Sequence, residues 1–158
     1  MPPRPQKSKS RNPETRDSYL FRIDSILPDY SFGIGHARVD IGSYAEYVHT
    51  EIKATCLIPK KLSGRTTRFT LMGDRQLASE LVEPSYQENK PIGIGTLTMR
   101  GQRNEYMGKL PFDALANLSA LILANGFQFI LLSGTALQRG TSRIDYIGFK
   151  SEADPEDY

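Results

Sequence analysis

The alternation of apolar and polar residues between Tyr44 and Ile58 constrains the fold more than any other feature of this sequence. Side chains at every second position of an extended strand point to the same face of a sheet. One face would carry Val48, Ile52, Ala54, Cys56 and Ile58, and the other Tyr47, His49, Glu51, Lys53 and Thr55. This pattern predicts an antiparallel strand with one face in the core and one in water.

Several other segments also show the features of strands. Ser18 begins a strand that is expected to end at Pro28-Asp29, with one parity formed by Tyr19, Phe21, Ile23 and Leu27. A glycine-punctuated loop over 31–42 follows it. The turn 59–64 predicts a hairpin between the 44–58 strand and residues 66–72. Further strands are expected at 96–100, 105–110, 127–132 and 143–150, so the total is about seven.

Two helices complete the expected fold. Asp74 is a suitable N-cap for a short helix over 75–83, which Pro84 ends. A core helix is expected over 111–125, with Gly126 as its C-terminal cap and Leu121 covered as well as the main apolar stripe. The prediction is an α+β fold: a mainly antiparallel sheet, sandwich-like or half-barrel-like, packed with one core helix and one short helix.

The ends of the chain carry opposite charge. Residues 1–16 hold five basic side chains against Glu14, a net charge of +4, and residues 152–158 carry −4. We therefore expect a disordered basic N-terminal arm over 1–16, one globular domain over 17–150 and an acidic tail over 151–158. The folded part is expected to stay near +2, the net charge of the whole chain.

Composition indicates an ordinary globular protein of the cytoplasm. Hydrophobic residues make up 39% of the 158 residues and charged residues 24%. The apolar stretch 114–132 is interrupted by polar residues, so no transmembrane helix is expected, and the polar start does not resemble a secretory signal. The single cysteine, Cys56, fits a reducing compartment and is interpreted as a buried small hydrophobe. No cofactor is predicted.

Metal-ligating residues are sparse. His49 and Glu51 share a face of the predicted strand, and the glycine loop that contains His36 and Asp40 has the freedom to fold over them. Two histidines and a carboxylate are the ligands of a common type of metal site, so His36, His49 and Glu51 form the metal hypothesis. The isolated Gly33-Ile-Gly35 and Gly93-Ile-Gly95 segments extend to no phosphate-binding motif.

Basic and aromatic residues suggest contact with nucleic acid. Five side chains are candidates for binding phosphates: Arg4, Lys7, Lys9, Arg11 and Arg16. Aromatic residues are frequent in the first third of the chain, at Tyr19, Phe21, Tyr30, Phe32, Tyr44 and Tyr47. Aromatic rings beside positive charge can hold single strands, although alternating aromatics in a first strand are more typical of a core.

The leading hypothesis is a non-enzymatic interaction module, a subunit or adaptor in a larger assembly that binds a protein partner or a second copy of itself. Its basis is the poverty of catalytic groups, which argues against an enzyme, together with tails of opposite charge. The first alternative is a nucleic-acid-associated protein that binds phosphates through the basic arm. The second is a metal-dependent enzyme built on the two histidines and Glu51.

Overall fold

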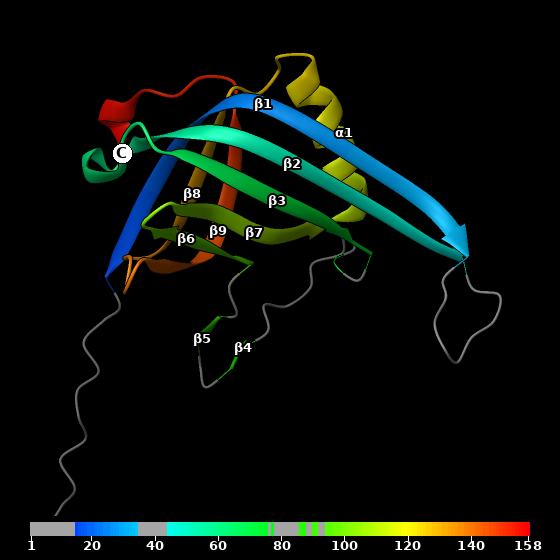
Figure 1. Cartoon of the computed structure of the whole chain (residues 1–158), viewed down its shortest axis with the longest axis horizontal. Helices are drawn as coiled ribbons and strands as arrows, with labels where there is room; N and C mark the ends of the chain where they lie inside the picture. The colour runs from blue at the N-terminus through cyan, green and yellow to red at the C-terminus, as the bar shows by residue number, and fades with distance from the viewer. Residues whose placement is uncertain (1–14, 35–43, 76, 78–85, 88–89, 92–93) are drawn as a thin grey trace, which may run out of the picture.

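A computed structural model describes residues 15–34, 44–75, 77, 86–87, 90–91 and 94–158. Figure 1 shows a strongly curved sheet with one helix against it. The sheet consists of β1 (Arg16–Ile34), β2 (Tyr44–Ile58), β3 (Thr66–Asp74), β6 (Gly95–Arg100), β7 (Arg103–Pro111), β8 (Phe129–Thr135) and β9 (Thr141–Lys150). The remaining elements are the two-stranded sheet of β4 (Tyr86–Gln87) and β5 (Lys90–Pro91), the helix α1 (Phe112–Leu123), and the 3₁₀ turns η1 (Lys60–Leu62) and η2 (Pro155–Asp157).

The seven long strands form a closed barrel in the order β1-β2-β3-β7-β6-β9-β8. Six neighbouring pairs are antiparallel, and β3 runs parallel to β7. The α+β class, the mainly antiparallel sheet and the core helix are therefore confirmed. The expected sandwich or half-barrel is corrected to a closed barrel, because residues 16–22 of β1 also pair with β8.

The first strand is longer than the sequence predicts, since it continues through Pro28 to Ile34. Proline lacks the N–H that a central strand needs, so the sequence predicts that the strand ends at Pro28. Beyond Ile23, whose N–H donates to the Gln128 carbonyl at 2.8 Å, the described residues of β1 pair with β2 alone. An edge position of this kind tolerates a missing N–H.

A register shift between Ile23 and Ser25 reverses the parity of β1. Asp24 is the extra residue, as in a β-bulge, so the side chains after it change faces. Ile26 packs against the core, whereas Leu27 is 68% exposed. The predicted burial of Leu27 is therefore wrong, because a period-two pattern does not reveal a bulge.

Aromatic rings fill the barrel interior. Phe69 contacts Phe21 edge-on, with ring centroids 5.0 Å apart, and its centroid lies 5.4 Å from that of Tyr106. The Tyr106 ring lies against the backbone of Gly95 and Gly108, which face each other in β6 and β7. A Cβ atom on either glycine would lie 2.3 Å from the Tyr106 hydroxyl oxygen. The two glycines therefore provide the space that this buried ring occupies.

The helix α1 is covered on one side. Leu115 and Ile122 are buried, but Leu121 and Leu123 are 48% and 57% exposed, so the expected wide coverage is wrong. The left-handed residue at its end is Asn125, with φ of 59°, in place of the predicted Gly126. The Gly126 N–H still closes the helix by donating to the Leu121 carbonyl at 2.8 Å.

A buried hydroxyl pair joins α1 to the barrel. The side-chain oxygens of Thr50 and Ser119 lie 2.8 Å apart, and Ser119 also donates to the Leu115 carbonyl at 3.0 Å. The Thr50 hydroxyl therefore has a hydrogen-bond partner inside the core.

The predicted short helix over 75–83 lies outside the described residues, apart from Arg75 and Leu77. No helix of the described ranges is long and apolar enough to cross a membrane.

The close approach of Tyr106 to Gly95 requires a residue without a side chain at position 95. We expect Gly95→Ala to lower the free energy of unfolding by about 2 kcal/mol, because the added methyl collides with a ring already held by Phe69. Urea denaturation measures this change. The exposed neighbour Thr96 is the control, and Thr96→Ala should cost less than about 1 kcal/mol. Equal stability of Gly95→Ala and wild type would contradict the proposed packing.

Candidate functional site

The far ends of β1 and β2 form a two-stranded projection from the barrel. Residues 25–34 pair with 44–53, whereas β3 pairs with β2 only from His49 onward. We call residues 25–34 and 44–48 the β1–β2 extension. Figure 1 shows it reaching past the end of β3 and past α1. Most of its length therefore lies outside the closed barrel.

Large apolar side chains lie exposed on the β1–β2 extension. The exposed fractions are 68% for Leu27, 59% for Tyr30, 61% for Phe32 and 65% for Tyr47. Tyr30 pairs with Val48 and shares the face that continues the barrel interior. Tyr47 pairs with Ser31 on the opposite face. Phe32 shares the face of Tyr30, and Leu27 shares the face of Tyr47. Single exposed apolar residues are ordinary, but here each face of one short ribbon carries two of them.

A polar and aromatic contact chain fixes the β1–β2 extension against the barrel. The Tyr30 hydroxyl donates to a carboxylate oxygen of Glu46 at 3.0 Å, and the second carboxylate oxygen pairs with Arg75. The Arg75 guanidinium also lies over the Phe112 ring, 4.2 Å from its centroid, at the start of α1. These contacts hold Tyr30 in one orientation relative to β3 and α1.

The sequence-predicted aromatics divide into two groups. Tyr19 and Phe21 are buried in the core, while Tyr30, Phe32 and Tyr47 lie on the extension. The Tyr44 side chain lies outside what the structure describes. Sequence reasoning missed the supporting role of Glu46 and Arg75, because the two residues are 29 positions apart and no local pattern links them.

The metal hypothesis remains a prediction. His49 and Glu51 lie on the same outer face of β2, with Nε2 of His49 4.0 Å from a carboxylate oxygen of Glu51. His36 and Asp40 fall outside the described residues. Among the described residues there is no group of three or more potential metal ligands.

Arg16 belongs to the first barrel strand. Its guanidinium donates two hydrogen bonds to Asp145 of β9, at 2.7 Å and 2.6 Å. These bonds lower the pKa of the Asp145 carboxyl. The other phosphate-binding candidates, Arg4, Lys7, Lys9 and Arg11, lie outside the described residues. Phosphate binding by this set remains a prediction.

Cys56 is buried in the core beside η1, in agreement with its interpretation as a small hydrophobe. Burial raises the pKa of its thiol to about 11. The thiol also donates to the Ile58 carbonyl, with sulfur and oxygen 3.2 Å apart. A thiol in this state is not a nucleophile at neutral pH, because the reactive form is the thiolate.

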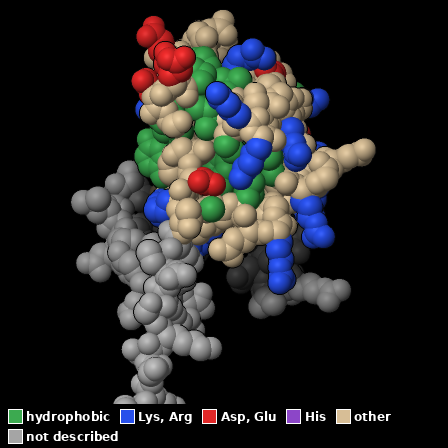
Figure 2. Space-filling model, turned by 90° about the vertical axis from the view of Figure 1, so that its left-hand side faces the viewer, with side chains coloured by type: hydrophobic (Ala, Val, Ile, Leu, Met, Phe, Trp, Pro, Cys, Tyr) green, Lys and Arg blue, Asp and Glu red, His purple; other side chains and the backbone are tan. Residues whose placement is uncertain are grey.

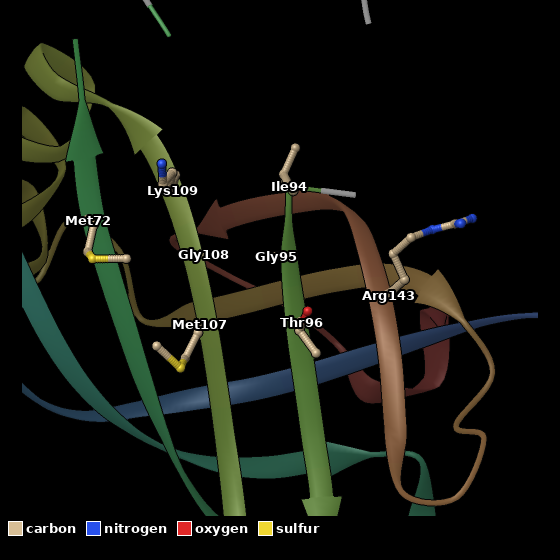
Figure 3. A pocket seen from close by; sticks show the side chains of 8 residues that line it. All are labelled: Met72, Ile94, Gly95, Thr96, Met107, Gly108, Lys109 and Arg143. Atoms are coloured by element: carbon tan, nitrogen blue, oxygen red, sulfur yellow. The ribbon is translucent and has the colours of Figure 1, made fainter. Parts of the chain in front are cut away.

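An open hollow of about 400 Å³ lies on the outer face of β3, β7, β6 and β9 (Figure 3). Its lining is Met72, Ile94, Gly95, Thr96, Met107, Gly108, Lys109 and Arg143. Met72 and Met107 provide adaptable thioether surface. The Lys109 ammonium lies 3.1 Å from an Asp74 carboxylate oxygen, so its charge is balanced. The hollow can receive an apolar group.

Comparisons of the chain with models of protein families, with curated proteins and with solved structures found no match. The functional argument therefore depends on the residues of this chain.

The Arg16–Asp145 pair should make stability depend on pH. A carboxyl whose pKa is lowered by folding contributes stability above its ordinary pKa of about 4, and this contribution is lost as pH falls through the folded value. We expect Arg16→Gln to raise the Asp145 pKa and to lower the free energy of unfolding at pH 6 by at most about 1 kcal/mol, since Arg16 is largely solvated. Near pH 2, the difference in free energy of unfolding between wild type and Arg16→Gln should be smaller.

Carbon-detected NMR titration of the Asp145 carboxyl, with urea denaturation at the two pH values, measures both effects. Arg22→Gln, which removes an exposed cation close to Asp24, is the control. An unchanged Asp145 pKa in Arg16→Gln would contradict the conclusion that Arg16 lowers this pKa.

Proposed function

We propose that this chain is a non-enzymatic interaction module, a subunit or adaptor that binds a protein partner through the β1–β2 extension. The observation that carries the proposal is the exposed apolar surface of Leu27, Tyr30, Phe32 and Tyr47 on a ribbon that projects from the barrel. Aromatic side chains of this kind dominate the binding energy of protein interfaces.

The barrel itself does not require this surface. Closure depends on residues 16–22 of β1 pairing with β8. Val48 and Ile26 of the extension contact the core, but its exposed side chains Leu27, Tyr30, Phe32 and Tyr47 are not part of it. Exposed apolar area costs free energy in water, and burial against a partner recovers it at about 25 cal/mol per Å². An interface therefore explains side chains that folding leaves unburied.

The contacts of the β1–β2 extension also suit binding. Because Glu46 links Tyr30 to Arg75, part of the apolar surface is already oriented before a partner arrives. Preorganisation of this kind reduces the entropy lost on association. On the opposite face, Asp29 pairs with His49 in the strand register, so polar groups border the apolar side chains. An apolar centre with a polar rim is the usual anatomy of an interface.

The test begins with native mass spectrometry of the protein isolated gently from its source. We expect a complex with a protein partner or a second copy. Its affinity should fall at least about tenfold in Tyr30→Ser/Phe32→Ser or in Leu27→Ser/Tyr47→Ser, which remove the exposed apolar side chains of the two faces separately. None of the four side chains belongs to the core, so the barrel should fold normally in both variants. Circular dichroism and thermal unfolding verify the fold of each variant.

Leu121→Ser/Leu123→Ser is the matched control, because it removes two similarly exposed apolar side chains from α1. This control should bind like wild type. A bare monomer at micromolar concentration would contradict binding through the extension. A complex that neither Leu27→Ser/Tyr47→Ser nor Tyr30→Ser/Phe32→Ser weakens would also contradict it.

A further inference from the structure

Three chain reversals meet at the end of the barrel opposite the β1–β2 extension. They are the β2–β3 connection with η1, the β6–β7 turn at Gly101-Gln102 and the β8–β9 connection at 136–140. The Met99 N–H donates to the Gly140 carbonyl at 2.7 Å, which joins the last two. The parallel pairing of β3 with β7 places the start of both strands side by side.

Basic residues are concentrated in these reversals and the strand ends that lead into them. Residues 53–68, 98–105 and 136–141 contain eight lysines and arginines and a single carboxylate, Glu105. The basic residues are Lys53, Lys60, Lys61, Arg65, Arg68, Arg100, Arg103 and Arg139, and we call them the basic surface. Figure 2 shows many basic side chains on this side of the molecule. The whole chain carries only +2, so the charge is strongly localised.

Strand register explains why part of the basic surface faces solvent. Lys53 pairs with Arg68, and Arg68 pairs with Glu105, so the three side chains follow one row across the outer face of the sheet. The adjacent residues Ala54 and Thr67 are buried inside. Arg103 forms an ion pair with Glu105, which leaves a large positive excess along the row and its turns.

The turn at Arg139-Gly140 brings two further arginines together. Gly140 has φ of +83°, a conformation that favours glycine, and a Cβ there would lie 2.8 Å from Cβ of Arg100. This close approach places Arg100 beside the turn that carries Arg139. Cations from β6 and from the β8–β9 connection thus become neighbours although they are distant in the sequence.

The N-terminal segment joins the barrel at this end. The Thr15 carbonyl accepts a hydrogen bond of 2.8 Å from the Ala136 N–H, in the same β8–β9 connection. The acidic C-terminus lies on the same side in Figure 1, so the positive region has a negative neighbour.

The composition of the basic surface selects among anionic partners. Of the large exposed hydrophobic side chains in the described residues, none belongs to 53–68, 98–105 or 136–141. Insertion into a lipid bilayer or an apolar protein interface requires such side chains. Binding to a polyphosphate does not require apolar side chains, because it is driven by cations that displace counterions from the phosphates.

We propose that the basic surface binds the phosphate backbone of a nucleic acid without reading its sequence. Four of the arginines supply paired N–H donors for phosphate oxygens, and the three lysines supply point charges, while Arg103 pairs with Glu105. Their positions on separate turns match a ligand whose charges repeat along its length. This site is distinct from the protein-binding extension and does not depend on it.

Fluorescence anisotropy with the full chain tests the proposal. The probes are a labelled single-stranded oligothymidine and a duplex of random sequence, each of about 20 nucleotides per strand, titrated between about 50 and 200 mM salt. About five neutralised phosphates predict a slope of log affinity against log salt near −3.5 for the single strand and near −4.5 for the duplex. Binding that ignores salt would overturn the proposal, as would no binding at about 100 µM protein.

Charge-removing variants locate the site. Arg68→Gln/Arg100→Gln/Arg139→Gln should weaken binding at least about tenfold at the lowest salt and reduce the slope by about 2 to 3. The matched control, Arg22→Gln/Lys109→Gln/Lys150→Gln, removes the same charge elsewhere and should keep most of the affinity. Equal losses in the two triple variants would show a net-charge effect and overturn the proposal.

Two further measurements separate other sources of binding. If Arg4→Gln/Lys7→Gln/Lys9→Gln/Arg11→Gln abolishes binding while the Arg68 triple variant does not weaken it, the N-terminal arm is the site and the proposal fails. Binding to vesicles of phosphatidylserine and phosphatidylcholine without binding to either oligonucleotide also overturns it. Leu27→Ser/Tyr47→Ser should leave nucleic-acid affinity unchanged, so this proposal and the proposed function can fail separately.

Discussion

The barrel depends on the double pairing of the first half of β1. Residues 20–22 hydrogen-bond to β2 on one edge and to β8 on the other, and this is where the sheet closes. Tyr19 and Phe21 have no exposed surface because they face the core, and Leu20, on the opposite face of the strand, is also fully buried. The Arg16–Asp145 ion pair adds a polar contact between β1 and β9. Once closure ends at Arg22, the remainder of the same strand is free to project.

Elements with an unbroken local pattern were predictable. The bounds of β2 match the alternation between Tyr44 and Ile58, and α1 lies within the expected 111–125. Barrel closure was not predictable, because it joins Arg16 to Thr135 and no local periodicity encodes a contact over that separation. The length of β1 was missed for a different reason, since Pro28 is compatible with an edge strand but resembles a terminator.

The candidate surfaces were only partly visible in the sequence. The stretch 53–68 contains five basic residues and no carboxylate, but a net charge of only +2 for the whole chain hides this local concentration. The basic surface also requires Arg100 and Arg139, which reach the same end of the barrel through the β6–β9 and β8–β9 pairings. The aromatics of the extension are visible in the sequence as a group, but their exposure follows from the end of the β1–β8 pairing at Arg22, which no local pattern encodes.

The 15 residues of β2 connect the two surfaces, with the β1–β2 extension at one end and the β2–β3 connection at the other. At about 3.3 Å per residue, this strand spans at most about 50 Å. Between these ends, β2 is bonded to β1 on one side and to β3 on the other, which makes it a stiff spacer. A protein on the extension and a polyanion on the basic surface would occupy separate space, and the chain would hold them at a set distance and orientation.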